Sequence, residues 1–571
     1  MKWALIQNLL LIRLLRNTQV THQLTTVKFC KTGFCNYSYL LFYLLVLIFL
    51  NKSVRILPLG RIVLISISNL YRNKFLTKKN DTMKNTFYLL LLLVTISSCQ
   101  TSNKALINKR DYSFLTDSLN INQQLEKHKL AGFSLVVFKN YEIVYSNQFG
   151  VKSIISDEKI DKNTAFSTAS ISKPITAILC HILEEKGLIN LNDPIDKYLK
   201  RWHLPKSKFT KNSNPTWKQF LNHTAGTSQH GFADYYEGDT IPTLKQSLLG
   251  QIPRYDKEIE FLFTPGTNWQ YSGGGYTIIQ MALEDTLNKP IAELAQEYIF
   301  SPLGLKNTTM IQPNEKGFLT NIALVHDVNK KVIKTGLPIT PQVAPSGLWS
   351  TPNDLAKLFI EFQNALRNKN NKLISNSIAK KIAEVTALKN AVGGWSYLGQ
   401  KSFGYNNYDW VRCGGSNTGV GGDIFATVTD GNGFIYFANG EKPNRFPVFM
   451  QTNKKLLTLM DFEKKSLKEE LQEIPLSLKK KLIGTYNDFL FGQGMATKII
   501  EKNNRLYVES PFYELFKGKN DNELVYLKNG LFKIIDYPNL LKFEFKNEKI
   551  NFVILTRDNM STRIQLIKNE K

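Results

Sequence analysis

The stretch TAFSTASISKPITAILCHILEEKG, residues 164–187, places a serine three residues before a lysine at the start of an apolar helix. Apolar residues then follow with helical spacing and share one face of the predicted helix: Ile175, Ile178, Leu179, Ile182 and Leu183. Gly187 ends this pattern. Ser170 therefore lies at the positive end of a helix dipole, and Lys173 follows one turn later on the same side. A partly buried lysine there can lose its proton near neutral pH and accept the proton of the serine.

Spacing alone does not establish this chemistry. The chain is rich in lysine, and the same Ser-x-x-Lys spacing recurs in polar surroundings at Ser156/Lys159, Ser377/Lys380 and Ser477/Lys480. A helix-capping serine followed by a solvated lysine is the structural alternative for Ser170 and Lys173.

Two further stretches carry candidate functional residues. FTPGTNWQYSGGGYTIIQMALE, residues 263–284, sets Tyr271 in a loop delimited by proline and glycine, directly before a helix. WVRCGGSNTGV, residues 410–420, sets Gly414, Gly415 and Ser416 on a strand that leads into a hairpin. Taken alone, Tyr271 also fits a packed loop aromatic, and the glycines also fit a bulged strand.

Together the three stretches resemble the serine β-lactamase and penicillin-binding protein family, nearest the class C β-lactamases and the related esterases and D-amino-acid peptidases. That family orders its motifs as Ser-x-x-Lys, then Tyr-x-Asn, then Lys-Thr-Gly or His-x-Gly on an inner strand, and the order and spacing here agree. The resemblance extends through FLNHTAGT (220–227) and PSGLWSTPNDLA (345–356), and covers about residues 115–460.

The resemblance implies a role for each matching residue. Ser170 is the implied nucleophile and Lys173 its proton partner. Tyr271, with a pKa lowered by nearby cations, is the implied general base, which would also activate the deacylating water. The backbone N–H groups of Ser170 and Ser416 would form the oxyanion hole, where developing negative charge is stabilised.

The chain departs from the family pattern at two positions. Gly273 stands where the second motif usually has asparagine, so an amide that would contact the lysine and the substrate is missing, and we interpret this as altered specificity. Cys413 stands where the third motif usually has Lys or His, which argues against efficient β-lactam hydrolysis because a neutral thiol cannot hold a substrate carboxylate. Arg412 is adjacent but faces the opposite side of the strand unless a bulge shifts the register. Cys413 as a nucleophile of its own is a further alternative.

Other chemistries have weaker support in this sequence. A literal Lys-Thr-Gly at residues 334–336 lacks a core strand and is interpreted as a surface loop. His223 and His230 flank a Thr-Ala-Gly segment and suggest a Ser-His pair with Ser228, but we interpret His223 as a structural loop residue because the resemblance places it away from the nucleophile. We find no Gly-x-Ser-x-Gly elbow, zinc-binding His pair, phosphate loop or nucleic-acid motif, so no metal, cofactor or nucleic acid is expected.

The hydrophobic pattern predicts an α+β fold. Hairpins are expected at 133–150 and 422–440, with helices between them up to about residue 366 and strands again from Gly404. Such a pattern favours an antiparallel sheet, closed by the first and last segments of a catalytic domain at 115–460, with helices packed on it and a helical subdomain. A linker helix is expected within 461–480, and short strands at 481–571 predict a small β-barrel-like domain.

The N-terminal region has the composition of a targeting sequence. Residues 1–82 hold twelve Lys and Arg residues against one acid, and their apolar run at 37–50 is shorter than the roughly twenty residues a spanning helix needs. MKNTFYLLLLLVTISSCQ, starting at Met83, is typical of a signal peptide and resembles a bacterial lipoprotein signal. We therefore expect a non-native extension (1–82), a signal peptide (83–98), lipidation of Cys99 and a tether (99–114).

The sequence favours an exported serine hydrolase, anchored by lipid on the periplasmic side of a bacterial membrane. It would form an acyl-enzyme with a small-molecule or peptide substrate and cleave an ester, amide or D-amino-acid peptide bond. The alternative is a catalytically impaired binding or sensor protein, suggested by Gly273 and Cys413. Substrate identity and oligomeric state stay open.

Overall fold

The computed structural model of the protein describes residues 111–401, 410–462, 471–490, 495–511, 522–535 and 537–568. The chain divides into two units, residues 1–109 and 110–571, and the described residues belong to the second. The expected extension, the signal peptide, Cys99 and most of the tether lie outside the described residues. Among the described helices, none is long and apolar enough to cross a lipid bilayer.

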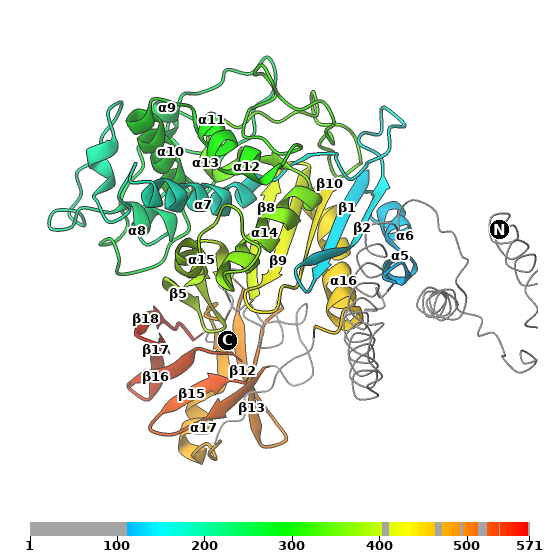
Figure 1. Cartoon of the computed structure of the whole chain (residues 1–571). Coiled ribbons are helices and arrows are strands. Elements are labelled where there is room, and N and C mark those ends of the chain that lie inside the picture. The colour runs from blue at the N-terminus through cyan, green and yellow to red at the C-terminus, as the bar shows by residue number, and fades with distance from the viewer. Residues whose placement is uncertain are drawn as a thin grey trace, which may run out of the picture. The chain divides into compact units, whose positions relative to one another are not determined.

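A central antiparallel sheet organises the catalytic region (Figure 1). Its strand order is β2-β1-β10-β9-β8-β7-β6-β5. The bounds are β1 (Gly132–Lys139), β2 (Glu142–Gly150), β5 (Ala387–Asn390), β6 (Gly393–Ser396), β7 (Gly399–Lys401), β8 (Trp410–Asn417), β9 (Val420–Thr427) and β10 (Gly433–Asn439). Because β1 pairs with β10, with Gly132 opposite Asn439, the first and last hairpins close one sheet as predicted.

The strands return earlier in the chain than expected. β5 begins at Ala387 rather than at Gly404, and β5, β6 and β7 each span only three or four residues. Glycines and short length leave these strands without the alternating pattern that marks a longer strand in sequence.

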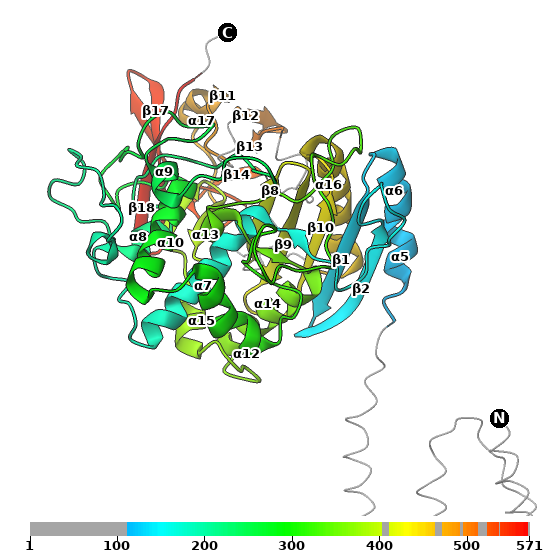
Figure 2. The same cartoon turned by 90° about the horizontal axis from the view of Figure 1, so that it is seen from above.

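The inner strands β9 and β10 are buried along their whole length because both faces of the sheet are covered. On β10, Phe434 and Tyr436 pack into one hydrophobic cluster, whereas Ile435 and Phe437 pack into the other. Helices α5 (Phe114–Leu119), α6 (Ile121–Lys127) and α16 (Lys442–Leu459) contribute to the first cluster. Figure 2 shows these helices on the side of the sheet opposite α7 and α14.

The opposite face carries the helical layer and the helical subdomain. The helical layer consists of η1 (Ala169–Ile171), α7 (Ser172–Glu185), α14 (Pro352–Leu366) and α15 (Asn376–Ala383). The subdomain contains η2 (Ile195–Tyr198), α8 (Trp217–Leu221), α9 (Leu244–Leu248), α10 (Gly273–Leu287), α11 (Ile291–Ala295), η3 (Gln296–Phe300), α12 (Ser301–Leu303) and α13 (Val343–Ser346). A two-stranded sheet, β3 (Phe166–Ser167) with β4 (Trp349–Ser350), joins the segment before η1 to the segment after α13.

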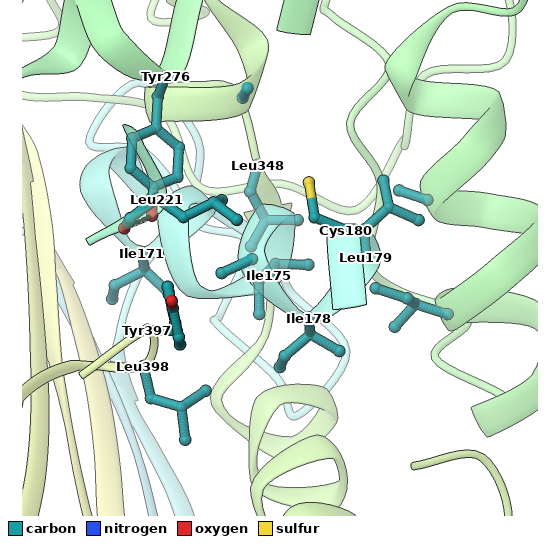
Figure 3. Packing of buried hydrophobic residues seen from close by; sticks show 14 of the residues in the cluster. Ile171, Ile175, Ile178, Leu179, Cys180, Leu221, Tyr276, Leu348, Tyr397 and Leu398 are labelled. Carbon is teal, nitrogen blue, oxygen red and sulfur yellow. Dashed lines mark hydrogen bonds between the residues drawn. The ribbon is translucent and has the colours of Figure 1, made fainter. Parts of the chain in front are cut away.

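Helix α7 is buried along nearly its whole length. Figure 3 shows Ile175 and Ile178 of α7 among side chains from distant segments, including Leu348 and Leu398. Gly187, with a φ of 72°, ends this helical segment, in agreement with the sequence pattern. This packing fixes the start of α7, which carries Lys173 and directly follows the turn that contains Ser170.

The C-terminal region is an all-antiparallel β half-barrel. Its strands pair in sequence order: β11 (Gly484–Tyr486), β12 (Thr497–Lys502), β13 (Arg505–Glu509), β14 (Glu523–Tyr526), β15 (Leu531–Ile534), β16 (Leu540–Lys546), β17 (Lys549–Arg557) and β18 (Met560–Gln565). The loop after β11 reaches the catalytic region, where the Ala391 N–H donates to the Phe489 carbonyl at 3.0 Å. Of the expected linker helix, the described residues contain α17 (Leu476–Leu482), whereas Gln472 instead pairs with Tyr526 in a β-bridge.

Candidate active site

Ser170 lies in the 3₁₀ turn η1, immediately before α7. The preceding Ala169 has a φ of 50°, an uncommon value for a residue with a side chain. Hydrogen bonds hold this turn, because the Thr168 N–H and hydroxyl both donate to the Leu348 carbonyl at 2.9 Å. The Ser172 hydroxyl donates to the Ala169 carbonyl at 2.6 Å and accepts from the Leu348 N–H at 2.9 Å. The serine is therefore presented on a rigid, locally strained turn.

The structure brings Lys173 and Tyr271 to the Ser170 hydroxyl. The Tyr271 hydroxyl donates to Ser170 Oγ at 2.9 Å, and Lys173 Nζ lies 3.3 Å from the same oxygen. Lys173 Nζ also donates to the Pro345 carbonyl at 2.9 Å, which fixes the amine from its other side. A nucleophile with a base in hydrogen-bond reach is the arrangement that acyl transfer requires.

Burial controls the charge of Lys173. Its side chain is 5% exposed, and desolvation lowers the pKa of the amine to about 7. The ammonium also lies over the ring of Tyr271, 4.8 Å from the centroid. Near neutral pH a substantial fraction of Lys173 is neutral and able to accept a proton, as the sequence predicted.

The expected lowering of the Tyr271 pKa is wrong. Burial raises the pKa of this phenol, and the hydrogen bond with Ser170 offsets only part of that increase. The rings of His223 and His230 lie 4.5 Å and 4.8 Å from the Tyr271 ring, so the phenolate would be poorly solvated. Tyr271 therefore stays protonated as a hydrogen-bond donor, and Lys173 is the better proton acceptor.

Strand β8 forms the wall beside the Ser170 turn. A Cβ built on Gly415 would lie 2.0 Å from the Thr168 carbonyl, so a side chain there would push β8 off the turn. A Cβ on Gly414 would lie 2.6 Å from an Asp423 carboxylate oxygen. Gly415 thus allows β8 to approach the nucleophile, Gly414 leaves room for the Asp423 carboxylate, and Ser416 follows on the same strand. The oxyanion role of the Ser170 and Ser416 N–H groups stays a prediction.

Cys413 faces the nucleophile but stays a thiol. Its Sγ lies 3.9 Å from the Ser170 carbonyl oxygen. Burial raises the pKa of Cys413 to about 12, so the thiolate is scarce at neutral pH and independent nucleophilic chemistry has no support. The register of β8 against β9 is regular, and Arg412 forms a two-point ion pair with Asp423, at 3.1 and 3.0 Å. Arg412 therefore does not replace the missing cation beside Ser170.

Arg445 brings positive charge to this wall and was missed in the sequence. It lies on α16, is 2% exposed, and donates through Nη2 to the Ser416 hydroxyl and through Nη1 to the Gly440 carbonyl at 2.6 Å. Burial lowers its pKa to about 10, which leaves it charged at neutral pH. Arg445 lies in the sequence KPNRF after the last hairpin, which is an ordinary helix start and does not indicate a functional residue.

A cleft of about 880 Å³ contains these residues. Its basic lining residues are Lys173, Arg254, Lys389, Arg412, Lys442 and Arg445. Its acidic lining residues are Asp234, Asp423 and Glu441. Basic side chains therefore outnumber acidic ones in the described lining of the cleft.

The remaining sequence candidates fall outside this constellation. His223 is buried and its Nδ1 accepts from the Ser272 N–H at 3.2 Å, while the Ser228 hydroxyl accepts from the Glu260 N–H at 3.0 Å, so these two do not form a catalytic pair. Lys334 is half exposed and pairs with Asp239 at 2.8 Å on a loop, in agreement with the surface interpretation of residues 334–336. Within the described ranges, no group of three or more His, Cys, Asp or Glu side chains is arranged to hold a metal ion.

Comparisons with known proteins identify the family of this chain. The family model described as Beta-lactamase matches residues 119–458. Penicillin-binding protein 4* of Bacillus subtilis (strain 168) is 28% identical over 185 residues, which are 32% of this chain and 38% of that protein. Protein flp of Staphylococcus aureus (strain MW2) is 25% identical over 236 residues, 41% of this chain and 44% of that protein. This chain thus spans less than half the length of the curated relatives it matches.

A solved structure supports the fold. The octameric penicillin-binding protein homologue from Pyrococcus abyssi superposes with a TM-score of 0.51 at 18% identity, covering 79% of this chain and all of that one. At that identity the likeness concerns the fold alone.

The pKa of Lys173 predicts a pH dependence for the reactivity of Ser170. The neutral amine is scarce below about pH 7 and predominates above it, so the rate of fluorophosphonate labelling should rise through about pH 7 and level off roughly one unit higher. Lys173→Met should label slowly and lose this rise. His203→Ala, an exposed site bonded to Asp196, should keep the profile. A midpoint near the ordinary lysine pKa of about 10 would contradict the desolvation argument.

Proposed function

We propose a serine hydrolase function for this chain, which belongs to the beta-lactamase family. The observation that carries the proposal is the contact of the Ser170 hydroxyl with both the Tyr271 hydroxyl, at 2.9 Å, and the Lys173 amine, at 3.3 Å. The substrate would be an ester, an amide or a D-amino-acid peptide.

The proposed reaction passes through an acyl-enzyme. Neutral Lys173 accepts the proton of Ser170 while Ser170 Oγ bonds to the substrate carbonyl carbon. The proton then passes to the leaving group as its bond to that carbon breaks. Water then bonds to the acyl carbon and gives a proton to the same amine. The bond between that carbon and Ser170 Oγ breaks, the amine returns its proton to Oγ, and the acid is released. Tyr271 orients Ser170 Oγ through its hydrogen bond, with its own proton retained in the resting state.

The cleft supports a substrate that carries negative charge. Arg445 stabilises the wall at Ser416, at the strand where the family usually places a cation and this chain has Cys413. The argument against carboxylate-bearing substrates, which rested on Cys413 alone, is therefore weaker than the sequence suggested. β-Lactams remain one class to be compared with esters and D-peptides.

A binding or sensor protein is the alternative, favoured by the raised pKa of Tyr271 and by Cys413. Turnover separates the two functions. A protein that is labelled at Ser170 by fluorophosphonate yet hydrolyses none of these substrates would fit a sensor that retains its nucleophile.

Removing the nucleophile tests the hydrolase directly. Ser170→Ala should abolish fluorophosphonate labelling and hydrolysis of p-nitrophenyl esters, because no other side chain in the cleft is activated in this way. Cys413→Ala is the matched control and should keep the labelling, since its thiol is protonated. Labelling that survives Ser170→Ala, or is lost in Cys413→Ala while the fold is intact, would contradict the assignment.

The role of Arg445 is tested with a matched pair of esters, one with a free carboxylate and one with that group amidated. Arg445→Met should lower the preference for the carboxylate at least about fivefold, since unit charges 4 Å apart interact by about 1 kcal/mol even in water. Arg445→Lys should retain part of the preference. If Arg445→Met leaves the preference for the carboxylate unchanged, Arg445 does not contribute to substrate selection.

We also propose that the protein is held at the cell envelope by lipid on Cys99, as the sequence MKNTFYLLLLLVTISSCQ suggests. In bacterial fractionation, the wild type should remain with membranes and Cys99→Ser should be released. Mass spectrometry that finds residues 1–82 in the mature protein would contradict this processing.

A further inference from the structure

The space that a side chain at position 273 would need is occupied by the loop at residues 229–232. A Cβ on Gly273 would lie 2.9 Å from the His230 carbonyl oxygen and 3.0 Å from the Phe232 ring. At Gly274, a Cβ would lie 2.9 Å from the Gln229 side-chain oxygen. The family's asparagine would not fit here without displacing the loop at 229–232, so glycine is required by this close approach.

The loop is held against the start of α10 by its backbone. The Gly273 N–H donates to the His230 carbonyl at 3.1 Å, and the Gly274 N–H donates to the Gln229 carbonyl at 3.0 Å. The Gly231 N–H donates to the Tyr255 hydroxyl at 3.1 Å. These bonds fix the backbone on both sides of the His230 side chain.

The His230 imidazole lies in the cleft beside the proposed catalytic pair. Its ring is 4.8 Å from the Tyr271 ring, at an interplanar angle of 41°, and it lines the cleft that contains Ser170. His230 is exposed, whereas His223, whose ring also lies close to Tyr271, is buried. His230 is thus placed to meet a substrate, and His223 is placed only to pack.

The surroundings keep His230 neutral. Partial burial lowers the pKa of the imidazole, and the nearby charges of Lys173, Arg254 and Lys389 lower it further. A neutral imidazole offers one N–H donor and one nitrogen acceptor. An asparagine amide offers the same two kinds of group.

We propose that His230 is a specificity-determining residue that hydrogen-bonds a polar group on the acyl part of the substrate. This inference rests on the proposed function. The acyl group is bonded to Ser170 Oγ in the acyl-enzyme that links the two halves of the reaction, and the Tyr271 hydroxyl contacts that oxygen, so a side chain beside Tyr271 lies near the acyl group. The substrate class is therefore an acyl group with an amide or a carbonyl close to the scissile carbonyl, as in N-acylated amino acid derivatives. His230 then makes the polar contact that an asparagine at position 273 would make, and Gly273 leaves the space for the loop that carries His230.

Two p-nitrophenyl esters with equal chain length test this proposal. The N-acetylglycinate carries an amide in its acyl chain, the pentanoate carries none, and the leaving group is the same. His230→Ala should reduce the ratio of the two kcat/KM values about fivefold, the loss expected for one hydrogen bond of ordinary net strength. His230→Gln, which restores an N–H donor and an acceptor, should recover part of the ratio. His203→Ala, outside the cleft, should leave the ratio unchanged, and tryptophan fluorescence should show that each variant is folded.

The outcomes separate this proposal from the function on which it rests. Equal losses on both esters would assign His230 to the positioning of Tyr271, and unchanged kcat/KM values on both esters would show that His230 makes no substrate contact. Either result overturns the proposal while the hydrolase function stands. A wild-type enzyme that hydrolyses neither ester and is not labelled at Ser170 would overturn the proposed function, and this inference with it.

Discussion

The burial of the Lys173 amine is the constraint on which the rest of the site depends. A lysine amine that is removed from water favours its neutral form. The Pro345 carbonyl and the ring of Tyr271 contact the Lys173 amine and hold it in place. Its pKa of about 7 gives the serine a proton acceptor at neutral pH. The same dry environment keeps Tyr271 and Cys413 protonated, so one physical cause sets the charge of three groups.

The nucleophile is positioned by segments that approach each other without side chains in between. The turn with Ser170 is fixed by hydrogen bonds to the segment at Leu348, and β8 reaches that turn because Gly415 has no Cβ. On the other side, Gly273 admits the loop that carries His230. Close packing of backbone against backbone therefore sets the distances among groups that lie up to 246 residues apart in the chain, from Ser170 to Ser416.

Part of the positive charge in the cleft comes from residues outside the three motifs, such as Arg254, Lys389 and Arg445. Cys413 removes the cation that the third motif usually supplies, yet Arg445 reaches Ser416 from α16. Likewise, the amide missing at Gly273 has a counterpart in His230, which reaches the same cleft from a different loop. At both departures from the family pattern, Cys413 and Gly273, a polar side chain from another segment therefore lies in the cleft: Arg445 and His230.

Elements with a local pattern could be predicted from the amino-acid sequence. These are the two closing hairpins, the helix that follows Ser170 and the antiparallel character of the sheet, because turn residues and apolar spacing act over a few neighbours. The sequence also placed Ser170 and Lys173 on one side of a helix start. Only the tertiary structure decided the protonation of Tyr271, the presence of Arg445 beside Ser416 and the position of His230, because burial and through-space charge depend on residues far apart in the chain. The short strands from Ala387 also needed their partners to form, since three or four residues carry too little pattern to be recognised alone.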